Sequence, residues 1–210
     1  MILLNATEIS KSYTASPLLS KLSYAINEGD KIGLIGVNGT GKSTLLRITA
    51  GVEEADSGRV VLTGGVRIGY LPQAPAYDPD KTVLEQAVSY LTPETAAEGD
   101  YQCKSMLNQL GISNFTRQMG TLSGGERKRV AMAGIFTNPC DILILDEPTN
   151  HIDSDTVEWL EGYLKKFRGV IFMVTHDRYF LDRVTNVILE LTDGKLYRHE
   201  GNYEVYLENR

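Results

Sequence analysis

Short apolar runs bounded by polar residues mark the second half of the chain. Residues 142–145 (IleLeuIleLeu) and 170–174 (ValIlePheMetVal) are uninterrupted apolar segments. Runs of four or five such residues are typical of strands buried on both faces of a parallel sheet. A helix is expected around 154–167, between the two strands, and another from Asp177. This alternation predicts an α/β fold.

The first seventy residues have the pattern of short strands joined by turns. Residues 22–26 and 31–36 are expected to be two strands that meet at the Gly-containing turn 27–30. Two more strands are expected at 59–62 and 66–71. The strand at 31–36 leads directly into a Gly-rich segment and then into a stretch with helical apolar spacing, so a strand–loop–helix unit is predicted there.

Residues 74–135 have a different character from the segments around them. Prolines interrupt regular structure after residue 71, and Thr82 is a plausible N-cap for the helix that follows it. A second helical stretch ends near Leu110 and Gly111. We therefore expect residues 1–210 to form a single domain, with a helical subdomain at about 74–135 inserted in the α/β core.

Composition narrows the class of protein without identifying it. Apolar residues make up 42% and charged residues 23% of the chain, as in ordinary globular proteins. The longest apolar run has five residues, whereas a membrane-spanning helix needs about 20, and no secretory signal is visible at the start. A cytoplasmic location is therefore expected. The formal net charge of −6 argues against broad binding to a nucleic-acid backbone.

A phosphate-binding loop is indicated by residues 36–43, which fit the pattern G-x-x-x-x-G-K-[ST]. The glycines let backbone N–H groups turn inward around phosphate oxygens, and the following helix adds the partial positive charge of its N-terminus. Lys42 is expected to reach the β- and γ-phosphates and the Ser43 hydroxyl to bind Mg²⁺. The expected nucleotide-binding residues of this loop are Gly36, Asn38, Gly39, Thr40, Gly41, Lys42, Ser43 and Thr44.

Two acidic residues follow the apolar run at 142–145. A phosphate loop needs an acidic side chain to help hold the metal ion, and Asp146 stands at the end of this predicted buried strand. Glu147 comes next and is expected just beyond the carboxyl end of the strand, where ligands bind in α/β sheets. We therefore expect Asp146 to be a metal ligand and Glu147 to be the base for an attacking water.

The segment Leu122-Ser-Gly-Gly-Glu126 opens the next predicted helix. The Ser123 hydroxyl and the amides of Gly124 and Gly125 form another anion site. With the phosphate loop before it and the acidic strand after it, the segment resembles the signature of ATP-binding-cassette (ABC) ATPases. The resemblance implies a P-loop ATPase domain with a parallel-sheet core, an antiparallel β subdomain and a small helical subdomain. It also implies ATP and Mg²⁺ as cofactors.

Further residues take their expected roles from this resemblance. Tyr13 resembles the aromatic residue that stacks on adenine, although a lone tyrosine is also common on surfaces and in cores. Gln73 resembles the glutamine that reaches Mg²⁺ and the attacking water, and His176 the histidine that binds the γ-phosphate. Asp153 resembles a residue of the loop that touches a second, facing cassette. In the family, the signature contacts the ATP held by that facing cassette.

Two segments make the resemblance more specific. They resemble the ABC-F branch, whose members carry two cassettes in one chain and act on ribosomes. The two segments are GluProThrAsnHisIleAsp at 147–153 and ThrHisAspArgTyrPheLeuAsp at 175–182. The GlyAsnTyr segment at 201–203 resembles the end of the first ABC-F cassette. The implied partners are a second cassette, in the same full-length chain or as a homodimer, and the ribosome with its rRNA and tRNA, reached through regions beyond this sequence. No direct membrane insertion is expected.

Two other interpretations are open, and the first of them involves the same ATP chemistry. The chain could be the nucleotide-binding subunit of an ABC membrane transporter, or a nucleotide-binding scaffold without turnover. The basic cluster Arg127-Lys128-Arg129 could contact RNA, but its place directly after the signature favours a solvated helix face or intramolecular ion pairs.

Overall fold

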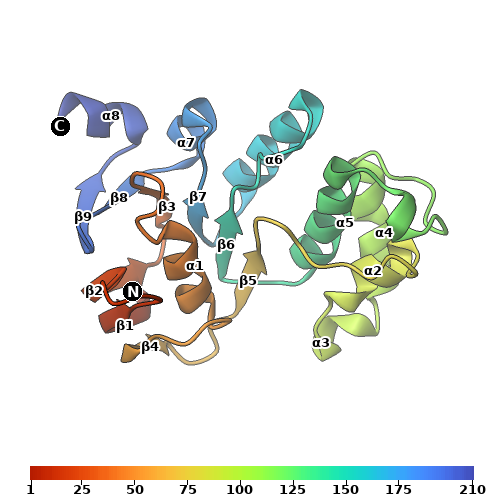
Figure 1. The fold of residues 1–210 in the computed structure, drawn as a ribbon. Coiled ribbons are helices and arrows are strands. Elements are labelled where there is room, and N and C mark those ends of the chain that lie inside the picture. Colours follow the sequence, from red (N-terminus) through yellow and green to blue (C-terminus); the bar gives the residue numbers. More distant parts are fainter.

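A six-stranded sheet forms the centre of the computed structural model, which describes residues 1–210 (Figure 1). The strand order is β5-β6-β7-β3-β8-β9, and every neighbouring pair is parallel except β8 and β9. All residues of β6 and β7 are buried, which confirms the two strands predicted from the apolar runs. The strands are β3 (Lys31–Ile35), β5 (Ile68–Leu71), β6 (Ile142–Asp146), β7 (Val170–Val174), β8 (Val187–Thr192) and β9 (Lys195–Glu200).

A second, antiparallel sheet has the order β2-β1-β4 and consists of β1 (Ile2–Lys11), β2 (Leu19–Asn27) and β4 (Ser57–Leu62). The strands expected at 22–26 and 31–36 do meet at the turn 27–30, but they belong to different sheets and do not pair. The reason is that β7 and β8 occupy both edges of β3, so no edge remains for β2.

Alternate residues of the central sheet enter two separate cores. One core packs Ile144, Phe172 and Leu189 against the antiparallel sheet and against α1 (Lys42–Ala50). The other packs Leu145 and Met173 against α6 (Ser154–Lys166) and α7 (Arg178–Val184). The short C-terminal helix α8 (Tyr203–Glu208) contacts α7, β8 and β9. The sheet is therefore covered on both faces, as expected for a parallel α/β arrangement.

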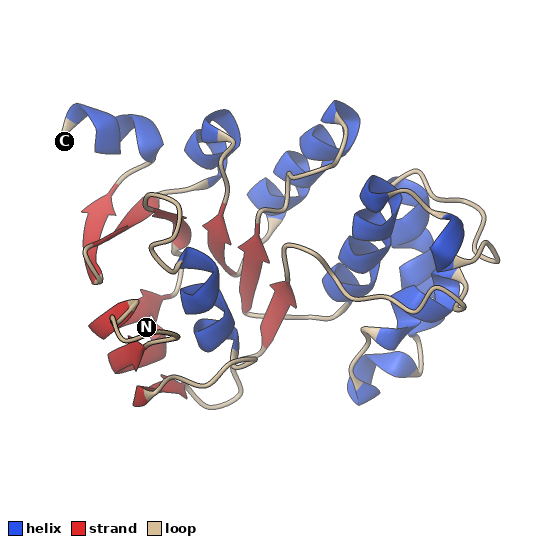
Figure 2. Ribbon diagram, in the orientation of Figure 1, coloured by secondary structure: helices blue, strands red, loops and turns tan.

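The remaining helices lie together at one side of the sheet, between β5 and β6 in the chain (Figure 2). Thr82 caps the first of them through a reciprocal capping box with Glu85, as the sequence indicated. The helices of this region span 83–137, whereas the insert was expected at about 74–135. They are α2 (Val83–Ser89), α3 (Pro93–Ala96), α4 (Gly99–Gln109), the 3₁₀ turn η1 (Met119–Thr121) and α5 (Gly124–Thr137).

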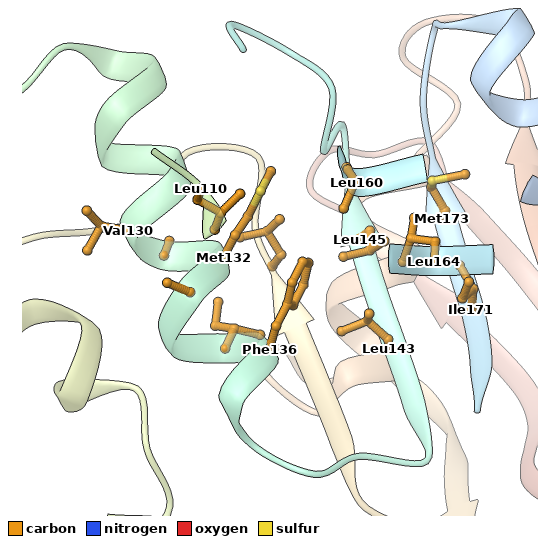
Figure 3. Packing of buried hydrophobic residues seen from close by; sticks show 14 of the residues in the cluster. Leu110, Val130, Met132, Phe136, Leu143, Leu145, Leu160, Leu164, Ile171 and Met173 are labelled. Atoms are coloured by element: carbon orange, nitrogen blue, oxygen red, sulfur yellow. The ribbon is translucent and has the colours of Figure 1, made fainter. Parts of the chain in front are cut away.

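Helix α5 joins the helical region to the sheet. Its buried side chains, including Met132 and Phe136, lie opposite Leu143 and Leu145 of β6 and Leu160 of α6 (Figure 3). Full burial of side chains of this size contributes roughly 1.5–3 kcal/mol each. This packing fixes α5 against β6. No helix of the chain has both the length and the apolar character needed to cross a bilayer.

Candidate active site

Four adjacent parallel strands end at the same edge of the sheet. The phosphate loop follows β3, Gln73 follows β5, and His176 follows β7, while Asp146 ends β6 and Glu147 comes next. Because β5, β6, β7 and β3 are consecutive in the sheet, their carboxyl ends lie side by side. The topology thus collects residues that are up to 140 positions apart in the chain, as between Gly36 and His176.

A cavity of about 360 Å³ lies at this edge. Nine of its lining residues are predicted site residues, and the other two are Leu18 and Val174. The nine are Asn38, Gly39, Gly41, Lys42, Ser43, Thr44, Gln73, Glu147 and His176. Gly36 and Thr40 line a neighbouring cavity of about 370 Å³, which Lys42 and His176 also border. The structure therefore places the predicted phosphate loop, Gln73, Glu147 and His176 around one space.

The phosphate loop needs left-handed backbone conformations that favour glycine. Gly39 has a φ of +82° and Gly41, the N-cap of α1, a φ of +99°. The Lys42 ammonium donates a hydrogen bond to the Gly36 carbonyl, so the side chain lies over its own loop. Burial lowers the pKa of Lys42, and the nearby carboxylates of Glu147 and Asp146 oppose that shift.

Glu147 is held by several groups at once. Its carboxylate oxygen Oε1 lies 3.0 Å from His176 Nε2, and Oε2 accepts a hydrogen bond of 3.2 Å from the His176 amide. The Glu147 amide donates to the Val174 carbonyl at 2.8 Å. Its φ is +50°, a left-handed conformation that is unusual for a residue other than glycine. Burial raises the pKa of Glu147, and the His176 ring opposes that shift.

Asp146 does not line this cavity, and it carries an unpaired buried oxygen. Its Oδ1 has no hydrogen-bond partner. Burial raises the pKa of Asp146, and the Ser43 hydroxyl opposes that shift. No group of three or more His, Cys, Asp or Glu side chains is arranged to hold a metal ion. An unpaired carboxylate oxygen beside a hydroxyl fits Mg²⁺, which binds through one or two carboxylates and completes its shell with water and nucleotide phosphates.

The signature residues lie outside this cavity. Ser123 caps α5 through a capping box, in which its Oγ accepts from the Glu126 amide at 3.2 Å and its own amide donates to the Glu126 carboxylate at 3.0 Å. Gly124 and Gly125 form the first turn of α5. Asp153 is also apart from the cavity and caps α6, accepting from the Thr156 amide at 2.8 Å. The chain thus does not bring its own signature to its own phosphate loop.

Tyr13 stands in the loop after β1 and does not line the cavity. Its ring is exposed, and its hydroxyl donates to Glu53, which in turn pairs with Arg47 of α1 at 2.8 Å. The Lys11 ammonium lies 5.4 Å from the centre of the Tyr13 ring. This network links Tyr13 to the helix that the phosphate loop opens.

The sequence analysis did not predict that Lys128 is buried. The expected solvated face is wrong for this residue, which is 3% exposed and donates hydrogen bonds to the carbonyls of Glu147 and Asn150, the latter at 3.3 Å. Its neighbours also make contacts within the chain: Arg127 lies over Tyr77, and Arg129 donates to the Leu110 carbonyl. The signal was available, because the positions three and four residues after Lys128 are apolar and share its helix face.

Fold and site together define a nucleotide-binding domain of the P-loop class. Residues 19–150 match the family described as ABC transporter. The chain therefore belongs to the ATP-binding-cassette family and is an ATP-binding cassette.

Relatives of this chain include longer proteins. It is 40% identical, over its whole length, to the uncharacterized ABC transporter ATP-binding protein YfmR of Bacillus subtilis, of which it covers 39%. It is 37% identical to the energy-dependent translational throttle protein EttA of Escherichia coli K12, with 92% of this chain and 42% of EttA covered. The chain thus spans about two-fifths of the length of these relatives. The match to EttA confirms the resemblance to the ABC-F branch.

Solved structures confirm the predicted fold class. The ATP-binding subunit of an ABC transporter has a TM-score of 0.83 at 21% identity, with 94% of this chain and 90% of that chain covered. A dimeric ATP-binding cassette in a post-hydrolysis state, bound to ADP and Pi, has a TM-score of 0.77 at 22% identity, with 94% and 98% covered. At these identities the likeness shows the fold alone.

Proposed function

We propose that this chain is the ATP-hydrolysing first cassette of an ABC-F protein and forms one half of an ATP-driven clamp that acts on the ribosome. The gathering of Gln73, Glu147 and His176 around the phosphate loop supports ATP hydrolysis. The ribosomal role is supported by the 37% identity to EttA and by the segments 147–153 and 175–182. A cytoplasmic location follows from such a role.

In this proposal the nucleotide extends from Tyr13 to the phosphate loop. The exposed Tyr13 ring stacks on adenine, and the backbone amides of residues 36–44 surround the phosphates. On ATP binding, the Lys42 ammonium leaves the Gly36 carbonyl and donates hydrogen bonds to the β- and γ-phosphates instead. Because the ammonium is already partly desolvated, its hydrogen bonds to phosphate are stronger than they would be in bulk water.

Mg²⁺ would be held by Ser43, Gln73 and Asp146, directly or through water. When bound, the ion neutralises negative charge on the β- and γ-phosphates. The unpaired Oδ1 of Asp146 and the placement of Ser43 and Gln73 on the same cavity support this assignment.

Glu147 acts as the base in the proposed reaction. Its buried carboxylate orients the attacking water and accepts the water's proton, while His176 holds the γ-phosphate. The raised pKa suits a proton acceptor, since it lies nearer neutral pH than that of an exposed carboxylate. In-line attack then releases phosphate from ADP, with most of the rate acceleration coming from positioning and electrostatics.

A facing cassette completes the site. Four expected site residues lie outside the chain's own cavity, namely Ser123, Gly124, Gly125 and Asp153. We therefore assign them to contacts with the second cassette, either with its bound ATP or with its surface. The γ-phosphate would bridge the two cassettes, and its loss removes the differential affinity that favours the closed clamp. Hydrolysis therefore reopens the clamp.

A transporter subunit is the second candidate function, favoured by the likeness in fold to a transporter's ATP-binding subunit. The decisive experiment sediments ribosomes with the full-length protein that carries this cassette in its Glu147→Gln form. We expect ATP-dependent co-sedimentation that ADP does not support. A protein that hydrolyses ATP, stays in the supernatant and instead co-purifies with a membrane permease would overturn the ribosomal role and leave the ATPase assignment standing.

A further inference from the structure

Lys128 is a buried cation for which the proposed ATPase mechanism has no use. It lies on α5, five residues after Ser123, and only 3% of its surface is exposed. Burying an ammonium is costly unless hydrogen bonds compensate for the lost water. Its two partners are backbone carbonyls, those of Glu147 and Asn150. Both belong to the segment directly after β6, so the cation ties the signature helix to the loop that carries the proposed base.

The loop held by Lys128 contains a strained residue. Glu147 has a φ of +50°, and such conformations cost about 1–3 kcal/mol and persist only where surrounding contacts enforce them. The amide of Glu147 bonds to Val174 on one side of this residue. On the other side, the Glu147 carbonyl accepts from Lys128 and, at 3.2 Å, from the Asn150 amide. Lys128 is thus one of the contacts that enforce the backbone angle from which the carboxylate projects.

A second contact joins α5 to the same loop. A Cβ atom on Gly125 would lie 2.7 Å from the His151 carbonyl oxygen, so the first turn of α5 packs directly against the backbone at residue 151. The loop 147–151 therefore meets α5 at two places, through the Lys128 ammonium and through the bare backbone of Gly125. With β6 and α5 also joined by the buried core, the loop has little freedom to move independently of α5.

We propose that Lys128 is a positioning residue for ATP hydrolysis: by tethering the loop 147–150 to α5, it holds Glu147 in the backbone conformation that aims its carboxylate at the nucleotide. This inference rests on the proposed role of Glu147 as the base. Because α5 also carries the signature, which is assigned to the facing ATP site, the tether connects the two sites of the clamp.

The test replaces Lys128 with each of two neutral residues in turn. The ATPase activity of each variant and of the wild-type chain is measured at increasing protein concentration. Lys128→Met fills similar space but donates no hydrogen bond, whereas Lys128→Gln retains an N–H donor. We expect kcat to decrease in the order wild type, Gln, Met, by about ten- to hundredfold for Met, with KM and ATP affinity unchanged. If the Met variant does not fold, the comparison of Gln with wild type still decides.

Lys31→Met is the matched control. Lys31 is a half-buried lysine whose ammonium also donates to two carbonyls, those of Phe167 and Gly169, at the opposite end of the strands from the cavity. Its loss should lower thermal stability, followed by the fluorescence of Trp159, and leave kcat unchanged. A double variant with Glu147→Gln adds a second check, because Lys128→Met should not lower the rate further once the base is gone.

The outcomes separate this inference from the proposed function. Full-length wild-type protein, with both cassettes, that showed no ATP turnover would contradict the proposed function itself. Turnover that persists at the wild-type kcat in a folded Lys128→Met protein would overturn the positioning role alone. The same holds if KM changes and kcat does not, or if Lys31→Met lowers kcat as much as Lys128→Met does.

Discussion

His176 binds both carboxylate oxygens of Glu147, through its ring Nε2 at 3.0 Å and its backbone amide at 3.2 Å. The side chains differ sharply in exposure, 66% for His176 and 6% for Glu147. The exposed ring can therefore move while the carboxylate stays fixed. In the proposed mechanism, Nε2 turns to the γ-phosphate and frees Oε1 for a water molecule, while the amide still holds Oε2. His176 would thus couple phosphate binding to activation of the proposed base.

Glu147→Gln should abolish turnover without abolishing ATP binding. The amide keeps the shape of the side chain but cannot accept the proton of the attacking water, so we expect kcat to fall by about 10²–10⁴-fold. Uncleaved ATP should then accumulate in a dimer of the isolated chain, which sedimentation velocity would detect. Glu161→Gln on α6 is the control, since Glu161 pairs with Arg183 away from the cavity. Normal phosphate release from the Glu147→Gln protein would remove Glu147 as the base.

Removal of the His176 ring should alter the pH dependence of hydrolysis as well as its rate. Burial raises the pKa of Glu147, and the ring opposes that shift. His176→Ala therefore raises this pKa further. Since the base must be ionised, activity rises as pH increases through the pKa, and the acid limb of kcat/KM against pH should move to higher pH. His199→Ala, outside the cavity, should leave the limb in place. An acid limb that moved to lower pH would contradict the coupling.

Lys42→Ala should weaken ATP binding. A charge-assisted hydrogen bond contributes about 1.5–3 kcal/mol, so its loss predicts a roughly ten- to hundredfold rise in the dissociation constant for ATP. Isothermal titration calorimetry would measure the change, with Lys104→Ala on the exposed face of α4 as the control. ATP affinity equal to that of the wild type would refute the phosphate-loop assignment.

Local patterns predicted those parts of the fold that are determined by neighbouring residues. The buried strands β6 and β7 and the Thr82 cap each depend on a few adjacent side chains, and all three are confirmed. Strand β1 was not predicted, because register shifts and a φ of +49° at Glu8 break its alternation. The pattern also gave no sign of β8, β9 and α8. The sheet order depends on long-range pairing, so the placement of β2 and β3 in different sheets could not be predicted from the turn that joins them.

The candidate site was more predictable than the sheet order. Gln73, Glu147 and His176 each follow the carboxyl end of a strand, so adjacency in a parallel sheet was enough to bring them together. The apolar residues that share the helix face of Lys128 signalled its burial, but its partners are backbone carbonyls 19 and 22 residues away, for which the sequence carries no signal. The roles of the gathered residues remain predictions until the substitutions above are measured.

The two signature glycines offer a test of the facing cassette, because their surroundings within the chain differ. A Cβ on Gly124 would meet nothing within 4 Å, so Gly124→Ala should leave thermal stability and ATP binding by the isolated chain unchanged. If ATP of a second cassette approaches this backbone closely, the added methyl group should still prevent the ATP-induced dimer of the Glu147→Gln protein.

Gly125→Ala should behave differently, because its methyl group would lie 2.7 Å from the His151 carbonyl within the same chain. Overpacking of this kind typically costs about 1–3 kcal/mol, so this variant should unfold at lower temperature. Sedimentation velocity and thermal unfolding of both variants therefore separate a contact between cassettes from a contact inside one. A Gly124→Ala protein that still dimerises with ATP would show that the signature does not contact a facing nucleotide, even if Gly125→Ala is destabilised as expected.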